Sequence, residues 1–148
     1  MTYPTLIALV VTVCGGAAVA LQAPINAALA DGLRSTIGAA AVSFAVGLVA
    51  LLVVLVLTGD GAALGRIGNV NPWLLVGGFL GSFYVWSIVF AVPVLGVLTA
   101  ISAVVLGQLL AALMLDAMGP FGLQAIEITW QRVAGVVLVG AGLILSKL

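Results

Sequence analysis

Long uncharged runs alternate with short charged or glycine-rich joints along this chain. The uncharged runs cover residues 1–30, 35–59, 67–115 and 133–146. A helix needs about 20 mostly apolar residues to cross the hydrocarbon core of a bilayer. The first two runs each have the length of one span, whereas the third is long enough for two. The pattern therefore predicts membrane-spanning helices connected by short joints.

Prolines, glycines and tryptophans mark the ends of the predicted helices. Pro72 and Trp73 open the third helix, because proline needs no amide donor in a first turn and tryptophan favours the membrane interface. Pro93 and Gly96 form the joint that divides the longest uncharged run into two spans. The predicted helices cover about residues 5–29, 36–58, 72–92, 96–116 and 130–146, with loops at residues 59–71 and 117–129.

The apolar runs predict helices rather than strands. Inside hydrocarbon every backbone amide needs an internal partner, and the uniformly apolar segments lack the alternation of a transmembrane barrel. The expected fold class is an all-α membrane protein, with residues 1–148 forming a single transmembrane domain. Five transmembrane helices would place the two termini on opposite sides of the membrane.

Composition supports a membrane protein and excludes several other classes. The chain is 65% hydrophobic and 5% charged, whereas soluble domains carry about 25% charged residues. With no histidine and a single cysteine, Cys14, it has neither the ligands for a zinc site nor an internal disulfide. A net charge of zero gives no footprint for nucleic acid. The chain also lacks a catalytic triad and a phosphate loop, so we expect no metal, no cofactor and no enzyme activity.

The basic residues are balanced across the predicted spans. Arg66 and Arg132 fall on one side, and Arg34 and Lys147 fall on the other. Lysine and arginine in short loops set the orientation of membrane proteins, and acidic residues contribute little. The balance predicts that the chain inserts in both orientations and pairs antiparallel with itself as a homodimer. The alternatives are that other features select one orientation, or that a partner of opposite orientation supplies the other half.

Small residues recur at close-packing spacing in the predicted spans. Such residues let membrane helices approach closely, which drives their association. They indicate either packing within one chain or a seam between two chains. The last helix is the best candidate for the seam, through Gly135 and Gly142. The candidates for packing within the chain are Ser43, Gly47, Gly77, Gly78, Gly81 and Gly107.

Polar residues inside the spans mark a candidate solute site. Gln22 and Asn26 share one helix face, and Pro24 between them frees a backbone carbonyl one turn earlier. Polar groups at this depth persist only where protein or water covers them. The alternative is that Asn26 helps to cap the helix and Gln22 only joins helices. The candidate solute-binding residues are Gln22, Asn26, Ser82, Tyr84 and Gln108.

No carboxylate lies deep within a predicted span, although proton-coupled exporters of cations usually need one there. Asp116, at the end of the fourth span, is the candidate for ion coupling. The alternative is a structural charge at the membrane interface.

Several segments, in this order, carry a family resemblance: residues 21–29 (LQAPINAAL), 43–47 (SFAVG), 72–73 with 77–85 (PW, GGFLGSFYV), 107–110 (GQLL) with Asp116, and 134–140 (AGVVLVG). This set resembles the YdcZ-like family of bacterial inner-membrane exporters, a five-helix branch of the drug/metabolite transporter superfamily. The resemblance implies a half-transporter that works as an antiparallel homodimer, related to the four-helix small multidrug exporters with one helix added. Those exporters carry a glutamate in their first helix, and this chain has none there.

The sequence therefore predicts a multi-pass inner-membrane protein that moves a small neutral polar or anionic solute by alternating access between inverted protomers. Two alternatives remain at this point. The same glutamine and asparagine side chains could line a small dimeric channel. The chain could also be an accessory membrane subunit without transport of its own.

Overall fold

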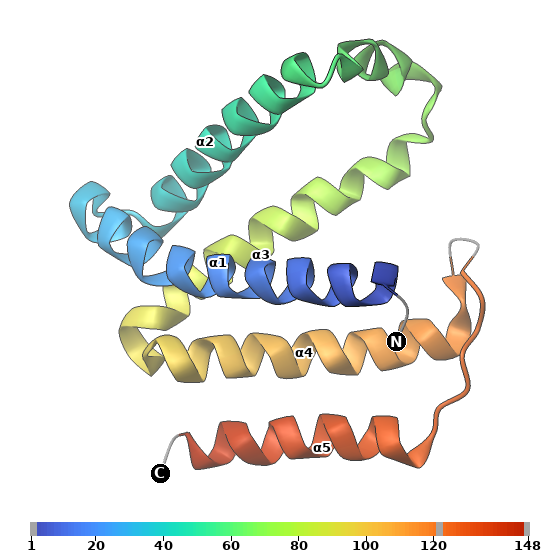
Figure 1. Cartoon of the computed structure of the whole chain (residues 1–148). Helices are drawn as coiled ribbons and strands as arrows, with labels where there is room; N and C mark the ends of the chain where they lie inside the picture. The colour runs from blue at the N-terminus through green and yellow to red at the C-terminus, as the bar shows by residue number, and fades with distance from the viewer. Residues whose placement is uncertain (1–2, 121–122, 147–148) are drawn as a thin grey trace. The chain divides into compact units, whose positions relative to one another are not determined.

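The computed structural model describes residues 3–120 and 123–146, and helices are the regular elements of this part of the chain (Figure 1). The all-α fold class is confirmed for these residues. The α-helices are α1 (Tyr3–Leu33), α2 (Thr36–Leu57), α3 (Val76–Leu95), α4 (Val97–Met118) and α5 (Trp130–Leu145). Two 3₁₀ helices, η1 (Asp60–Asn69) and η2 (Pro72–Leu75), connect α2 to α3.

Four helical stretches are long and apolar enough to cross a membrane, namely Tyr3–Leu33, Thr36–Leu57, Pro72–Leu95 and Val97–Met118. The apolar helix α5 has 16 residues. At a rise of about 1.5 Å per residue it extends about 24 Å, which is shorter than a hydrocarbon core of about 30 Å. A fifth span, and with it the placement of the termini on opposite sides, stays a prediction.

Local capping explains where two of the helices begin. Ser35 has an extended backbone, and its Oγ accepts a hydrogen bond from the Gly38 amide at 2.9 Å. This bond satisfies one of the amides that a first turn leaves without a partner. Asn71 does the same before η2, where its Oδ1 accepts from the Trp73 amide at 3.4 Å.

Several elements end later than the sequence pattern predicts. Helix α1 continues past residue 29 to Leu33, and α3 continues past Pro93 to Leu95. Pro93 removes the amide that would bond to the Val89 carbonyl, and its ring crowds that carbonyl. The helix nevertheless continues for two residues beyond it and ends at Leu95. Gly96 makes the joint, with φ 78° and ψ 162°, a conformation that is essentially restricted to glycine.

The segment between α2 and α3 differs from the expected irregular loop, because residues 60–69 form η1. Gly59 ends α2 with φ 77°. The chain then satisfies its backbone groups through tight local turns instead of an open loop. Composition alone indicated a loop because glycine and asparagine weaken α-helices, but they are compatible with short 3₁₀ turns.

The chain divides into two compact units, Met1–Pro93 and Val94–Leu148, and each is described here by itself. In the first unit, α1 packs against α2. Its small buried core consists of Ala30, Ala39 and Val89, with Leu29 and Val85 packed against it. The two alanines let the helices approach closely, and Val89 brings α3 to the same core.

In the second unit, α4 and α5 pack side by side (Figure 1). Ser146, at the end of α5, donates a hydrogen bond from its Oγ to Thr99 Oγ1 near the start of α4, at 3.4 Å. At the other end, Gly119 caps α4 with φ 58°. The following segment returns to α4, where the Ile126 amide donates to the Asp116 carbonyl at 2.7 Å.

Large apolar side chains cover the outside of both units. Val56, Leu57, Phe79 and Val137 are each more than 60% exposed, whereas Val89 is the largest fully buried side chain among the described residues. A water-soluble fold would bury such a surface. The arrangement fits a chain whose outer surface contacts lipid.

Candidate functional site

A hydrogen-bonded polar cluster joins α1 to α2 in the first unit. The Gln22 Nε2 atom donates to Ser43 Oγ at 2.9 Å, and Asn26 Nδ2 donates to the same oxygen at 3.2 Å. Asn26 is only 5% exposed, although the helix around it is mostly apolar. These contacts cover the polar face that the i, i+4 spacing of Gln22 and Asn26 predicts on α1.

Tyr84 of α3 lies on the same side of the unit as this polar cluster. Together with Gln22 and Asn26 it lines a cavity of about 10 Å³. A cavity of this size holds about one water molecule. Apolar side chains complete its wall, namely Val19, Ala23, Val85 and Ile88. Three of the candidate solute-binding residues, Gln22, Asn26 and Tyr84, are therefore neighbours in the structure.

The other two candidate residues lie elsewhere. Ser82 donates its hydroxyl to the Gly78 carbonyl within α3, at 3.0 Å. It lines a different cavity, of about 360 Å³, whose walls come from α2 and α3. Gln108 is exposed on α4, in the second unit. Their part in binding solute stays a prediction, and the structure gives neither of them a contact with the polar cluster.

Ser43 is the member of the cluster that sequence reasoning placed in another role. Its position in a stripe of small residues on α2 predicted helix packing. In the structure its hydroxyl accepts both amide hydrogen bonds from α1. The available signal was its polarity, since Ser43 is the one residue with a polar side chain in α2 after the first residue, Thr36.

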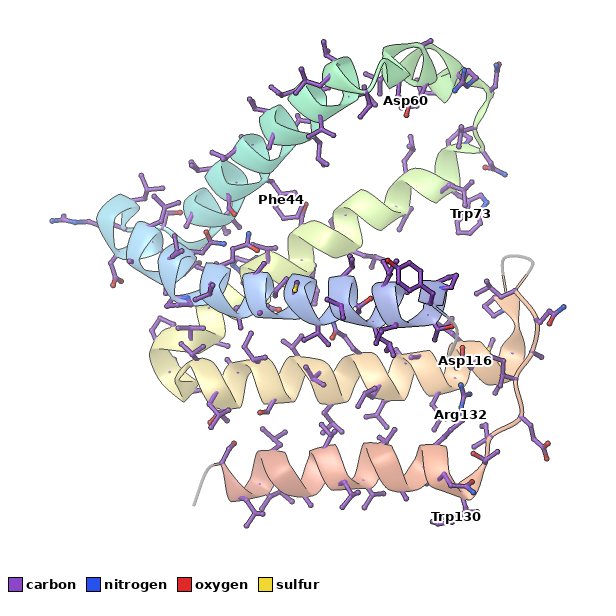
Figure 2. The ribbon with its side chains drawn as sticks, viewed as in Figure 1. Phe44, Asp60, Trp73, Asp116, Trp130 and Arg132 are labelled. Carbon is purple, nitrogen blue, oxygen red and sulfur yellow. The ribbon has the colours of Figure 1, made fainter. Side chains whose placement is uncertain are left out.

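The cavity of about 360 Å³ that Ser82 lines is an aromatic groove between α2 and α3. Phe44 of α2 points toward α3 (Figure 2), and a Cβ atom on Gly81 would lie 3.6 Å from its ring. Trp86 lies 5.8 Å, between ring centroids, from both Phe83 and Phe90. An alanine at residue 81 would therefore make an ordinary van der Waals contact with the Phe44 ring.

The remaining small-residue candidates face open space. A Cβ atom added to any of them would meet no neighbouring atom within 4 Å in the part of the chain that the structure describes. Among the described residues of one chain, these glycines pack against no other helix. Their roles in packing or in a dimer seam stay predictions. They are Gly47, Gly77, Gly78, Gly107, Gly135 and Gly142.

The second unit holds an ion pair at one end of its two helices. Arg132 Nη1 lies 3.0 Å from Asp116 Oδ2, and both side chains are labelled in Figure 2. This nitrogen makes no aligned hydrogen bond among the described residues, so the contact is one of charge rather than of hydrogen-bond geometry. Asp116 is thus neutralised locally, and its role in ion coupling stays a prediction.

The ion pair borders a cavity of about 300 Å³ between α4 and α5, otherwise lined by Leu109, Ala112, Leu113, Gly135 and Val136. The described residues contain no group of three or more acidic, histidine or cysteine side chains that could hold a metal ion.

Comparison with known families matches residues 7–145 to the family described as "Putative inner membrane exporter, YdcZ". No curated protein and no solved structure matches the chain. The match extends over all of α2, α3, α4 and α5 and most of α1, and it agrees with the apolar helices that the structure contains. The chain therefore belongs to the YdcZ family of the drug/metabolite transporter superfamily and is a multi-pass inner-membrane transporter.

Proposed function

We propose that the protein is a half-transporter that works as an antiparallel homodimer and exports a small neutral polar or anionic solute by alternating access. The observation that carries this proposal is the polar cluster, in which Gln22 and Asn26 of an apolar helix converge on Ser43. Polar side chains within a membrane span are costly, and they commonly mark the path of a solute. The family to which the chain belongs supplies the transport function.

Two observations support a pair of inverted chains as the working unit. The cavity beside the polar cluster has room for about one water molecule, so one chain in this state offers no solute-sized site there. The basic residues also balance between the two sides, with Arg66 and Arg132 against Arg34 and Lys147. Lys147 lies outside the described residues, and the balance requires that α5 also crosses the membrane. Two inverted copies would supply the two-fold symmetry that other transporters encode as inverted repeats.

The charges of the chain favour a solute that is not a cation. Asp116, in the last turn of α4, is already paired with Arg132. The polar cluster contributes amides and a hydroxyl but no carboxylate. An uncharged hydrogen-bonding site is suited to neutral polar solutes, and its amide N–H groups also suit anions.

Solute transport tests this proposal directly. A thermal-unfolding screen of the purified protein against small metabolites would first identify a stabilising solute, because a ligand that binds the folded state raises the midpoint. Uptake of that solute into liposomes should saturate for the wild type and fall at least about tenfold for Gln22→Leu, since the loss of one charge-assisted or buried hydrogen bond amounts to about 1.5 kcal/mol. Gln131→Leu is the matched control, because Gln131 is an exposed glutamine at the start of α5.

The outcomes separate the rival functions. Uptake that does not saturate and proceeds at channel rates would indicate a channel. Absence of uptake for any stabilising solute would indicate an accessory subunit. Unchanged uptake by Gln22→Leu would refute the polar cluster as the solute site.

Site-directed labelling tests the antiparallel pair. Single cysteines at Gly61 and Gly32, introduced in a Cys14→Ala background, keep every basic residue in place and lie at exposed positions. Each cysteine should react with an impermeant reagent from both sides of the membrane, in comparable amounts. Reaction of each position from one side only would refute dual insertion.

A further inference from the structure

We infer that the side-chain amides of Gln22 and Asn26 form a donor clamp for one oxygen atom of the solute, and that Ser43 occupies this clamp while no solute is bound. The donor clamp is defined by the Gln22 Nε2 and Asn26 Nδ2 atoms. This inference rests on the proposed function, because it assigns the chemistry of the same polar cluster. It adds a substrate class, a solute with an accessible acceptor oxygen, and a specificity-determining residue.

The geometry of the cluster carries the inference. Two N–H donors, one turn apart on α1, meet a single oxygen of α2 at 2.9 and 3.2 Å. An oxygen has two lone pairs and can accept both bonds at once. Any acceptor oxygen that replaced Ser43 Oγ would find the same two donors already oriented. Asn26 is 5% exposed, so its donor has little access to other partners.

The small size of the adjoining cavity explains why Ser43 must be displaced. That cavity, about 10 Å³ in volume, is lined by Gln22, Asn26 and Tyr84, and it is large enough for a water molecule only. A solute therefore cannot bind beside the intact cluster. Its oxygen has to take the place of Ser43 Oγ, which requires α2 to release Ser43 from α1. Solute binding and the separation of these two helices are thereby coupled.

The donor clamp discriminates between solute classes. Carboxylates, amide carbonyls and hydroxyls all present an oxygen that accepts hydrogen bonds, and an anionic acceptor forms bonds roughly twice as strong as a neutral one. An ammonium group has donors but no acceptor, so it would face two N–H groups in the amide orientations that the structure contains. Both amides would have to turn over before their carbonyl oxygens could accept from it. The clamp therefore favours oxygen acceptors over amines.

Ser43 acts in this scheme as an internal competitor, so its removal has opposite effects with and without solute. Ser43→Ala leaves two amide donors without their acceptor, which should lower the thermal midpoint of the solute-free protein. The same change removes the group that the solute has to displace. Apparent affinity for an oxygen acceptor should therefore rise about fivefold for each ordinary net hydrogen bond that Ser43 no longer holds, or about 25-fold for both.

The experiment uses the full-length protein in detergent and three probes with the same carbon chain: propionate, propionamide and propylammonium. Thermal midpoints are recorded for the wild type, Ser43→Ala, Ser43→Thr and Gln22→Leu. We expect propionate and propionamide to stabilise Ser43→Ala more than the wild type, and propylammonium to stabilise neither. Ser43→Thr retains the hydroxyl and should resemble the wild type. Gln22→Leu removes one donor and should lose the response to both oxygen probes.

Side-chain NMR provides a second readout that a purely structural role for Ser43 would not produce. In nitrogen-15-labelled protein, the amide protons of Gln22 and Asn26 should shift saturably with propionate and propionamide and not with propylammonium. Ser43→Cys, which keeps the volume but has only a weak acceptor, replaces Ser43→Ala if the alanine variant does not fold.

The result that overturns the inference is equal stabilisation of Ser43→Ala and wild type by the oxygen probes, or a stronger response to propylammonium. Persistence of the response in Gln22→Leu would overturn it as well. A failure of the proposed function gives a different result, because Gln22→Leu would then take up the solute as well as the wild type does. If uptake depends on Gln22 while Ser43→Ala behaves as the wild type, the transport site stands and the donor clamp fails.

Discussion

Arg132 Nη1 lies 3.0 Å from Asp116 Oδ2, and this ion pair joins the first turn of α5 to the last turn of α4 (Figure 2). The pair places opposite charges together where the chain leaves one apolar helix and begins the next. It lies beside Gly119, whose backbone turns the chain back toward α4. This end of the second unit is therefore organised both by charge and by a glycine turn.

The ion pair should contribute little to stability. Its side chains are 36% and 37% exposed, and partly exposed pairs of this kind contribute about 0–1 kcal/mol. Asp116→Asn and Arg132→Gln should each lower the free energy of unfolding within that range. The charge-reversed double variant, Asp116→Arg with Arg132→Asp, should recover part of the loss. A double-mutant cycle based on thermal unfolding measures the coupling, and a loss far above this range would point to a further role for Asp116.

Gly119→Ala should destabilise the second unit strongly. The backbone φ of 58° costs a residue with a Cβ atom about 1–2 kcal/mol. The added Cβ would also lie 2.8 Å from the Ala125 amide nitrogen and 2.9 Å from the Leu123 carbonyl oxygen. Gly65→Ala is the matched control, since Gly65 is in open space and has no positive φ. Similar thermal midpoints for the two variants would contradict this account of the turn.

Gly96→Ala isolates the backbone contribution at the joint between α3 and α4. No described atom lies within 4 Å of a Cβ atom built there, yet φ is 78° and ψ is 162°. The cost should therefore be conformational only, about 1–3 kcal/mol. Thermal unfolding should show a smaller loss than for Gly119→Ala, in which a steric clash is added to the strain. If Gly96→Ala lost more thermal stability than Gly119→Ala, residue 96 would have to contact other residues in a conformation that differs from this one.

Asn26→Leu and Gln108→Leu should have different effects on stability. Asn26 is 5% exposed and bonded to Ser43, so its replacement should cost about 1–2 kcal/mol. Gln108 is exposed on α4, and leucine at an exposed position of this apolar helix should leave stability almost unchanged. Thermal unfolding in detergent and in liposomes compares the two variants. If the two variants lost the same stability in liposomes, Gln108 would have to gain a hydrogen-bond partner in the assembled protein.

Adding one basic residue should shift the orientation of the chain. Gly65→Lys adds a third basic residue beside Arg66, at an exposed position with open space around it. Because basic loops remain in the cytoplasm, most molecules should then insert with this segment inside. A cysteine at Gly61 should become reactive mainly from the cytoplasmic side. Adding Gly32→Lys on the opposite side should restore the balance, and unchanged labelling in both variants would contradict the charge argument.

Local sequence signals predicted much of the fold and part of the candidate site. The apolar runs located the helices, and Pro72 marked the start of the third helical stretch, although its first four residues form η2 and α3 begins at Val76. The four-residue spacing of Gln22 and Asn26 predicted a polar face on α1, and the structure places Tyr84 beside it. These features depend on helix periodicity and backbone chemistry, which act over a few residues and can therefore be recognised from the sequence.

Contacts between helices were harder to predict. Ser43 follows Asn26 by 17 residues and Gln22 by 21, and its place in a stripe of small residues suggested packing alone. Whether Ser82 and Gln108 would join the polar cluster also depends on how helices are rotated about their axes. No local pattern specifies that rotation, because several faces of α2, α3 and α4 are similarly apolar.

The sequence by itself determined that the chain is a helical membrane protein with a polar face on its first helix. Hydrocarbon requires each span to satisfy its own backbone, so long apolar runs permit little other than helices. Only the tertiary structure decided which residues meet that face. The close approach of α1 and α2 through Ala30 and Ala39, with Val89 packed against them, brings Ser43 onto the amides of Gln22 and Asn26. Such an arrangement arises from packing between helices, which the periodicity of a single helix does not encode.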